Sequence, residues 1–375
     1  MSGEGNAATL PALTGARWLA ASAVFVHHAG LAGYLSGGGQ QFLLDVGAAG
    51  HVGVSFFFVL SGFVLLWSTR SGERATTFWW RRVARVVPLH LVTAALALAL
   101  GFTVAPSLGP RAETGGWPAM ATNGGLLSSW VPGWSQAGNP VSWSLACEAF
   151  FYALFPIAAV ALGRRSRRSA WIWLAAAAVA AVLAAVAIDL SSADLSRVPL
   201  LRLPEFVAGL ACARLVRLGA WPSVRHRWAL GVVALGWIAA SHVPTAYAVS
   251  LTTLPGFVLL IGALAERQAS GVIGAGGSAL TNWLSRPWLV RLGEWSFAFY
   301  LVHILVMRTI EHTLVSHPAW SLVPGLGLLL GVLLVSVALS AVFHHAIEAP
   351  ANAWIRARTQ PRTTLRLDQL GQLGR

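Results

Sequence analysis

The stretch Leu13-Thr-Gly-Ala-Arg-Trp-Leu-Ala-Ala-Ser-Ala-Val-Phe-Val-His-His-Ala29 is mostly apolar but contains Arg17 and His28. From Arg17 to His28 is about three turns of α-helix, so both side chains would lie on one face, roughly 16 Å apart along the axis. Ionisable side chains at membrane depth are costly, and a histidine can take up and release a proton near neutral pH. We therefore expect this segment to have a function besides crossing the membrane.

The overall composition indicates an all-α, polytopic integral membrane protein. Of the 375 residues, 56% are hydrophobic and 10% are charged, and the mean hydropathy is +0.65. Soluble domains have about 25% charged residues, and a transmembrane β-barrel would instead show alternating strands of about ten residues. The net charge of +13 comes from arginines. They fall in short loops between apolar segments, where they set topology, so we expect no nucleic-acid partner.

About ten segments are close to the 20 mainly apolar residues that a membrane span requires. No internal repeat is evident, so we expect one transmembrane domain, 13–354, between a cytoplasmic N-terminal segment, 1–12, and a cytoplasmic polar tail, 355–375. The residues before the first apolar run carry no basic side chain, which argues against a cleaved signal peptide. The predicted spans are 13–31, 51–69, 87–105, 141–162, 170–188, 199–216, 228–243, 246–265, 289–310 and 321–343.

The arginines predict the orientation of these spans. The chain has no lysine, and all but four of its 26 basic residues fall on the same side of the membrane when the spans alternate. Because positive charge accumulates on the cytoplasmic side, we expect both termini in the cytoplasm and a multi-pass protein of the plasma membrane. The four arginines assigned to the opposite side are Arg111, Arg197, Arg202 and Arg308.

The depth of the polar residues predicts two zones. His28 lies in the outer half of its span, and the alternation of spans places Glu148 and His303 at a similar depth, with Tyr152 and Tyr300 one turn away on the same faces. A histidine with a carboxylate could remove a proton from a hydroxyl group. At the cytoplasmic edge lies a set of guanidinium groups suited to phosphate through bidentate hydrogen bonds. This inner set is Arg17, Arg82 and Arg85.

Six short motifs follow one another over most of the chain. They are Leu13–Ala29 with Arg17 and His28, Gly53-Val-Ser-Phe-Phe-Phe-Val-Leu-Ser-Gly-Phe-Val64, Phe78-Trp-Trp-Arg-Arg-Val-Ala-Arg-Val-Val-Pro88, Ser142-Trp-Ser-Leu-Ala-Cys-Glu-Ala-Phe-Phe-Tyr152, Ser296-Phe-Ala-Phe-Tyr-Leu-Val-His303 and Glu348-Ala-Pro350. In this order they resemble the membrane-bound acyltransferase-3 family, bacterial O-acyltransferases that modify sugars, antibiotics and cell-surface polymers. The chain departs from the family pattern at Cys147 and Ala149, on either side of Glu148.

The resemblance implies transfer of an acyl group, expected to be acetyl, from acyl-CoA as a co-substrate, with no bound cofactor and no metal. It implies His28 as the general base, with Glu148 as a second catalytic residue that orients the imidazole or holds the acceptor. Arg17, Arg82 and Arg85 would bind the donor. Residues expected to line the acceptor site or pocket are Trp143, Tyr152, Tyr300, His303 and Ser61.

Other interpretations remain open at this stage. Intramembrane histidine and glutamate also suit a proton-coupled transporter, although such proteins commonly contain internal repeats. Each polar residue could simply join helices by hydrogen bonds, and a basic residue beside a span could only anchor it in the lipid. The sequence leaves open whether the acceptor is an antibiotic or a cell-envelope glycan, as well as the acyl length and the oligomeric state.

Overall fold

The computed structural model describes residues 10–69, 72–110, 115–163, 166–269, 278–314 and 320–359, and within them the chain is helical. The helices are α1 (Pro11–Ala32), α2 (Gly37–Gly47), α3 (Gly53–Ser68), α4 (Ala75–Phe102), α5 (Gly116–Gly124), α6 (Trp143–Gly163), α7 (Arg167–Asp189), α8 (Pro199–Arg217), α9 (His226–Ala240), α10 (Thr245–Tyr247), α11 (Leu254–Ala269), α12 (Ala279–Leu284), α13 (Pro287–Leu314), α14 (Leu322–Phe343) and α15 (Ala349–Thr359). Shorter 3-10 or π turns are η1 (Gly50–Val52), η2 (Pro106–Leu108), η3 (Ser128–Trp130), η4 (Pro140–Ser142), η5 (Ala248–Thr252) and η6 (His344–Glu348).

The all-α prediction is confirmed, and a helix coincides with each of the ten predicted segments. Six stretches among the described residues are both long and apolar enough to cross a membrane: Gly37–Ser68, Ala75–Phe102, Pro140–Leu162, Arg167–Asp189, Pro287–Leu314 and Leu322–Ile355. The count of ten spans, the cytoplasmic position of both termini and the domain limits stay predictions. Most of segment 1–12, nearly all of the tail 355–375 and Arg111 lie outside the described residues.

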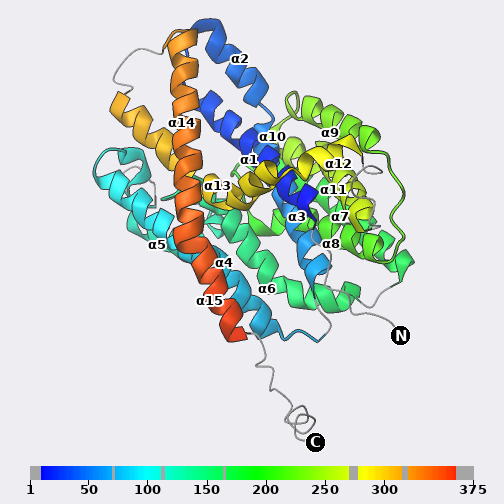
Figure 1. Ribbon diagram of the computed structural model, residues 1–375. Coiled ribbons are helices and arrows are strands. Elements are labelled where there is room, and N and C mark those ends of the chain that lie inside the picture. The colour runs from blue at the N-terminus through cyan, green and yellow to red at the C-terminus, as the bar shows by residue number, and fades with distance from the viewer. Residues whose placement is uncertain are drawn as a thin grey trace, which may run out of the picture.

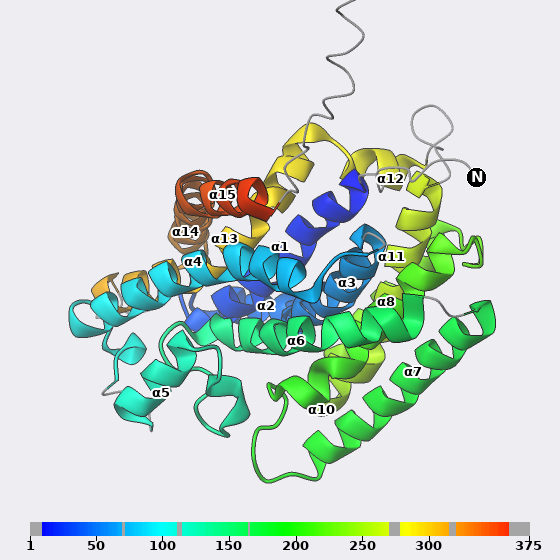
Figure 2. The same cartoon turned by 90° about the horizontal axis from the view of Figure 1, so that it is seen from below.

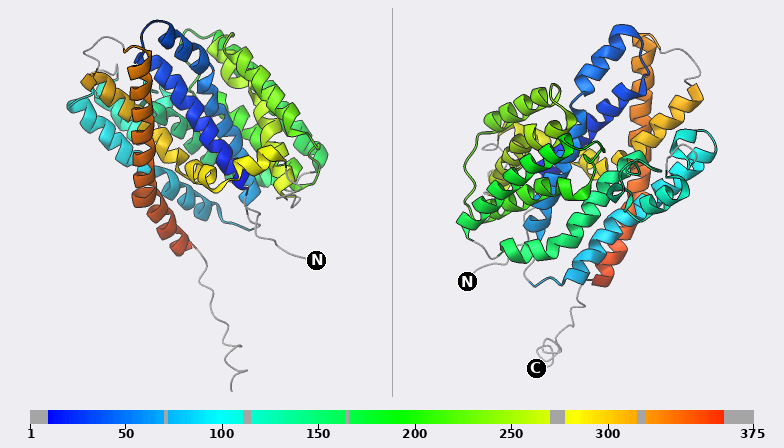
Figure 3. Two further views of the ribbon diagram at one scale, coloured as in Figure 1. Left: turned by 45° about the horizontal axis from the view of Figure 1, so that its top comes forward. Right: turned by 180° about the vertical axis from the view of Figure 1, so that it is seen from behind.

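The helices form a central group with a lipid-compatible rim (Figure 1). In the centre α1 packs on α13 and α3 packs on α8, while α7 and α14 cover α8 and α13 from outside. Figure 2 shows α7 and α14 at opposite edges, and in Figure 3 α14, η6 and α15 form one continuous rod along an edge. Both outer helices expose apolar side chains, which suits contact with lipid. Among these are Ile172, Val179, Leu183, Leu326, Leu330 and Leu334.

The long segment between α4 and α6 folds back into the bundle. Asn123 accepts a hydrogen bond from His90 of α4 through its main-chain oxygen, at 2.9 Å, and its amide donates to Ser142 at 2.6 Å. Asn139 donates to the carbonyl of Leu301, in the middle of α13, at 2.8 Å. These buried amides require partners, because an unsatisfied polar group in the core is costly. As a consequence α6 begins beside the middle of α13.

Close contact between α3 and α8 depends on two glycines. A Cβ atom added at Gly209 would lie 1.9 Å from the carbonyl oxygen of Val59, and one added at Gly62 would lie 2.0 Å from that of Phe206. Small residues at such crossings allow helix backbones to approach closely inside a membrane. Gly62 of the Gly53–Val64 motif therefore serves the close packing of two helices, whereas Ser61 beside it lines a cavity.

Replacing Gly209 by alanine should destabilise the protein by about 1–3 kcal/mol, because the new methyl group overpacks the α3–α8 crossing. Thermal unfolding in detergent would measure the change. Gly231→Ala in α9 is the matched control, since a Cβ there meets nothing within 4 Å. The control should be neutral or slightly stabilising, as alanine is the better helix former. Equal behaviour of the two variants would contradict the proposed crossing.

Candidate active site

A cavity of about 420 Å³ lies between α1, α3, α4, α6 and α13. Apolar side chains such as Phe57, Phe58 and Leu145 form much of its wall. Its polar lining includes three arginines from α1 and α4, a carboxylate and two tyrosines. These polar residues include Arg17, Arg82, Arg85, Glu148, Tyr152 and Tyr300.

Glu148 is held on one side of this cavity by its own helix. The hydroxyl of Tyr152, one turn further along α6, donates a 2.8 Å hydrogen bond to Glu148 Oε2. The guanidinium of Arg82 lies 6.0 Å from the centre of the Tyr152 ring and 5.8 Å from that of Phe78. Arg85, Arg17 and Arg82 all act electrostatically on the Glu148 carboxylate. The cavity thus has one acid facing three permanent cations.

The two arginines of α4 point into the cavity because they are three residues apart and so lie on one helix face. Arg81, on a different face, donates instead to Glu73 at 2.8 Å. Arg82 Nε is a buried donor for which the described residues supply no acceptor. A buried N–H without an acceptor is costly, so this position suits an anionic ligand that brings its own oxygen atoms.

A second acid, on the last helical rod, acts electrostatically on Arg17. The π turn η6 places Glu348, whose side chain is 4% exposed, 3.0 Å from His344 Nδ1. Glu348 also acts electrostatically on Arg17. A π turn shifts the residues after it around the helix axis and often marks a functional position. The closing Glu348-Ala-Pro350 motif therefore contributes a negative charge that favours the charged form of Arg17.

His28 and His303 form a separate pair further along α1 and α13. His28 Nδ1 lies 2.9 Å from His303 Nε2, and the two rings stack with centres 5.1 Å apart. Neither residue lines the cavity. Tyr300 connects the two places, because it lines the cavity while its ring lies 6.0 Å from that of His303, and its hydroxyl donates to the carbonyl of Val141.

The structure places Glu148 elsewhere than the sequence predicted. We expected Glu148 to share a layer with His28 and His303, but it lies among the arginines of the cavity. The reason is the inward fold before α6. The hydroxyl of Tyr300 bonds to the carbonyl of Val141, so these two residues lie at the same height in the bundle. Glu148 is seven residues further along the chain than Val141, which brings it about 10 Å closer to the side where the sequence predicted the arginines of α4, the cytoplasmic edge.

The other predicted pocket residues divide into two groups. Ser61, Tyr152 and Tyr300 line the cavity. Trp143 and His303 do not: His303 is bonded to His28, and Trp143 packs edge-on against Phe58 with ring centres 6.1 Å apart. Among the described residues there is no group of three or more histidine, cysteine or acidic side chains that could hold a metal ion.

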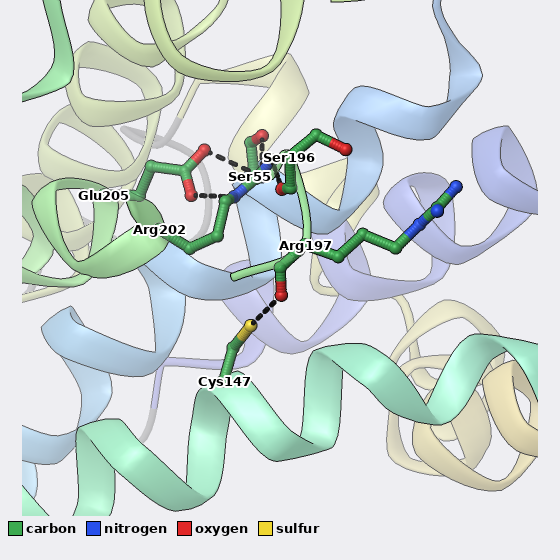
Figure 4. Close-up of polar contacts among 6 residues, drawn as sticks. All are labelled: Ser55, Cys147, Ser196, Arg197, Arg202 and Glu205. Carbon is green, nitrogen blue, oxygen red and sulfur yellow. Dashed lines mark hydrogen bonds and ion pairs between the residues drawn. The ribbon is translucent and has the colours of Figure 1, made fainter. Parts of the chain in front are cut away.

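Sequence reasoning missed an ion pair in the core. Arg202 and Glu205 are both 1% exposed, and the guanidinium contacts both carboxylate oxygens, at 2.9 and 3.0 Å. Figure 4 shows that Arg202 also reaches Ser55 of α3 and the carbonyl of Ser196. The topology analysis counted Arg202 only as a charge on the outer side of the membrane and did not pair it with Glu205. Two opposite charges three residues apart in an apolar segment were the signal that could have revealed the pair.

The ion pair also supports the wall of the cavity. The guanidinium of Arg202 lies 5.2 Å from the ring centre of Phe58, a wall residue, and 5.7 Å from that of Trp143. Beside it, the thiol of Cys147 points at the carbonyl of Arg197, with Sγ and oxygen 3.6 Å apart (Figure 4). This contact gives Cys147, one of the two residues at which the chain departs from the family pattern, a polar partner in the core.

Comparison with known proteins identifies the family. Residues 10–345 match the acyltransferase-3 family, described as an acyltransferase domain. The chain belongs to the acyltransferase-3 family. It is 35% identical over 368 residues to acyltransferase MdmB of Streptomyces mycarofaciens, covering 91% of each chain. It is 29% identical over 272 residues to the exopolysaccharide production protein ExoZ of Rhizobium meliloti (strain 1021), covering 70% of this chain and 78% of the relative. No solved structure matches the chain.

The predicted acyltransferase identity is therefore confirmed, and the protein is a multi-pass membrane acyltransferase. The family match spans the cavity and the histidine pair together, because it begins at the start of α1 and ends within η6. The elements that form both places thus belong to one domain of the family.

Removing one partner of the buried ion pair should be strongly destabilising. Glu205→Leu leaves Arg202 buried without its counter-charge and should cost about 3–5 kcal/mol in unfolding free energy, whereas the double variant Arg202→Met/Glu205→Leu should recover much of that loss. The matched control is Arg308 with Glu311, which has the same spacing but is 39% and 28% exposed. Glu311→Leu should cost less than about 1 kcal/mol. Similar losses in Glu205→Leu and Glu311→Leu would contradict this account.

Proposed function

We propose that the protein transfers an acyl group, expected to be acetyl, from cytoplasmic acyl-CoA to a hydroxyl of a sugar, polysaccharide or antibiotic. The observation that carries this proposal is the cavity with three arginines whose far wall, Tyr300, contacts the histidine pair. An acyl-CoA donor carries phosphates at one end and a reactive thioester at the other. It therefore matches a site that has cations at one end and, beyond the other end, a group that accepts a proton.

The arginines Arg17, Arg82 and Arg85 are proposed to bind the phosphates of the donor. Guanidinium groups bind phosphate in a bidentate manner and keep their charge when partly buried. Support comes from the orphaned Nε of Arg82 and from the excess of arginines over acids in the cavity lining. The apolar wall near Phe57 and Phe58 suits the less polar remainder of the donor.

The group transfer needs one base, and we assign this role to His28. The neutral imidazole takes the hydroxyl proton as the hydroxyl oxygen forms a bond to the thioester carbonyl carbon. The resulting tetrahedral intermediate collapses by breaking its carbon–sulfur bond. The leaving thiolate takes the proton back from His28, which gives the ester and free CoA thiol. Glu148, bonded to Tyr152 rather than to a histidine, is proposed to fix the cavity arginines instead of orienting the imidazole.

The class of acceptor rests on the family and on the relatives. One relative is named for exopolysaccharide production, and the more similar one is named as an acyltransferase. An antibiotic hydroxyl and a cell-envelope sugar hydroxyl are therefore both proposed acceptors. We further propose that the domain spans 13–354 in the plasma membrane, with both termini cytoplasmic, so that the arginine end of the cavity meets cytoplasmic acyl-CoA.

His28→Ala should lower kcat for acyl transfer by roughly 10²–10⁴-fold, because it removes the general base. Release of CoA thiol from acetyl-CoA by purified protein, with pooled hydroxyl acceptors, measures the rate. His242→Ala is a control at an exposed histidine, bonded to the carbonyl of Ile238. Near-wild-type turnover by His28→Ala would refute the assignment, and vesicle uptake of an unmodified substrate without thiol release would favour the transporter.

Arg85→Leu should raise the KM for acyl-CoA by roughly 10- to 100-fold with a smaller change in kcat, because it removes a charge-assisted hydrogen bond to the donor. Arg81→Leu is the matched control, since Arg81 is bonded to Glu73 and does not line the cavity. Initial rates at varied acetyl-CoA separate the two constants. A higher KM for the acceptor alone would mean that the arginines bind the acceptor instead.

A further inference from the structure

The hydrogen bonds around His303 determine how its protons are arranged. His303 Nδ1 lies 3.1 Å from the carbonyl oxygen of Phe299, one turn earlier on α13. A carbonyl oxygen only accepts hydrogen bonds, so Nδ1 of His303 must carry the hydrogen. In the neutral ring the other nitrogen, Nε2, then has a lone pair and accepts. This lone pair faces His28 Nδ1 at 2.9 Å.

The same reasoning then fixes His28. Because His303 Nε2 accepts, His28 Nδ1 must donate, and the neutral His28 ring has its lone pair on Nε2. We infer that His303 is a positioning residue, which holds His28 in the Nδ1–H tautomer and leaves Nε2 as the atom that takes the hydroxyl proton. The inference rests on the proposed function of His28 and assigns His303 a role other than contact with the acceptor.

The surroundings of His303 suit a residue that positions His28, and they exclude direct contact between His303 and a substrate. Its side chain is 0% exposed. Phe25, Phe299 and Tyr300 surround the imidazole, with ring centres 6.2, 5.6 and 6.0 Å away. Such packing restricts rotation of the ring, and a restricted ring holds its hydrogen-bond partner in a fixed orientation. His28, by contrast, is only partly buried.

His303 also stabilises the charged state of His28 without passing the proton on. When His28 takes a proton on Nε2, its Nδ1–H becomes a stronger donor, and the bond to His303 Nε2 becomes charge-assisted. A relay beyond His303 stops at the Phe299 carbonyl, which does not accept a proton. The pair therefore resembles a base with an orienting partner, in which the partner is a neutral imidazole rather than a carboxylate.

Two substitutions at His303 separate the hydrogen bond from the packing. His303→Gln keeps an acceptor near the position of Nε2, and His303→Phe keeps the ring but removes the acceptor. We expect His303→Phe to lower kcat by roughly 10²–10⁴-fold with an unchanged KM for acetyl-CoA, as loss of the correct tautomer does elsewhere. His303→Gln should stay within about 10-fold of wild type. His312→Phe, an exposed histidine on the same helix bonded to Ser107, is the control.

A second measurement does not depend on activity. In protein with ¹⁵N-labelled histidine at a pH where the imidazole is neutral, the ring-nitrogen shifts of His28, assigned by difference with His28→Gln, should show a protonated Nδ1. In His303→Phe they should show a changed or mixed tautomer. If the wild type has this tautomer but transfers no acyl group, the proposed function fails while the pairing stands. Full activity of His303→Phe, equal losses in His303→Phe and His303→Gln, or an unchanged His28 tautomer in His303→Phe would each overturn the inference.

Discussion

The free-energy cost of placing charge inside an apolar helical bundle determines how the ionisable side chains of this protein are arranged. An ionised side chain taken out of water must meet an opposite charge or several hydrogen-bond partners. Arg202 does so through the bidentate pair with Glu205 and through Ser55 (Figure 4). Glu148 has Tyr152, and Glu348 has His344. The arginines of the cavity have fewer protein partners, and Arg82 Nε has none among the described residues. That imbalance separates the cavity from the structural core and fits a site that binds an anion.

The same constraint explains why the chemistry is divided between two places. Arg308 and Arg197 already act electrostatically on His28, and three more arginines beside it would further disfavour the imidazolium that a base must form, because like charges repel across a medium of low dielectric constant. Arg17 and His28 share α1 but are separated by about three turns. Tyr300 and Phe57, with ring centres 6.3 Å apart, lie where the cavity approaches the histidines. A donor that binds through its phosphates and reacts at its far end can contact both the arginines of the cavity and the histidine pair. A compact anion would reach only the arginines.

Helix periodicity was sufficient to predict those parts of the site that depend on one helix at a time. The common face of Arg17 and His28, and that of Arg82 and Arg85, follow from spacing alone. Depth could not be predicted in the same way for Glu148, because it depends on a tertiary event, the inward fold anchored by Asn139 on Leu301. Counting residues from an assumed membrane edge ignores such folds. The pairing of Arg202 was missed for a related reason: an arginine counts as a topology signal only when it lies outside the bundle, and Arg202 is buried beside Glu205.

The neighbouring histidines of α1 show how tertiary contacts separate roles that the sequence leaves close together. The family resemblance implied His28 as the base, although His27 beside it carries the same imidazole. In the structure His27 Nδ1 donates to the carbonyl of Gly47, and its ring lies 5.2 Å from that of His51, so it joins α1 to the end of α2. His28 turns toward α13 instead and meets a ring whose own proton is fixed by the main chain. Both contacts hold the Nδ1–H tautomer, because the carbonyl of Gly47 and the Nε2 lone pair of His303 are both acceptors, so the two histidines differ in where they lie rather than in their tautomer. His27 bonds at the end of α2, whereas the partner of His28 packs against Tyr300, a residue of the cavity wall, and this location favours His28 as the base.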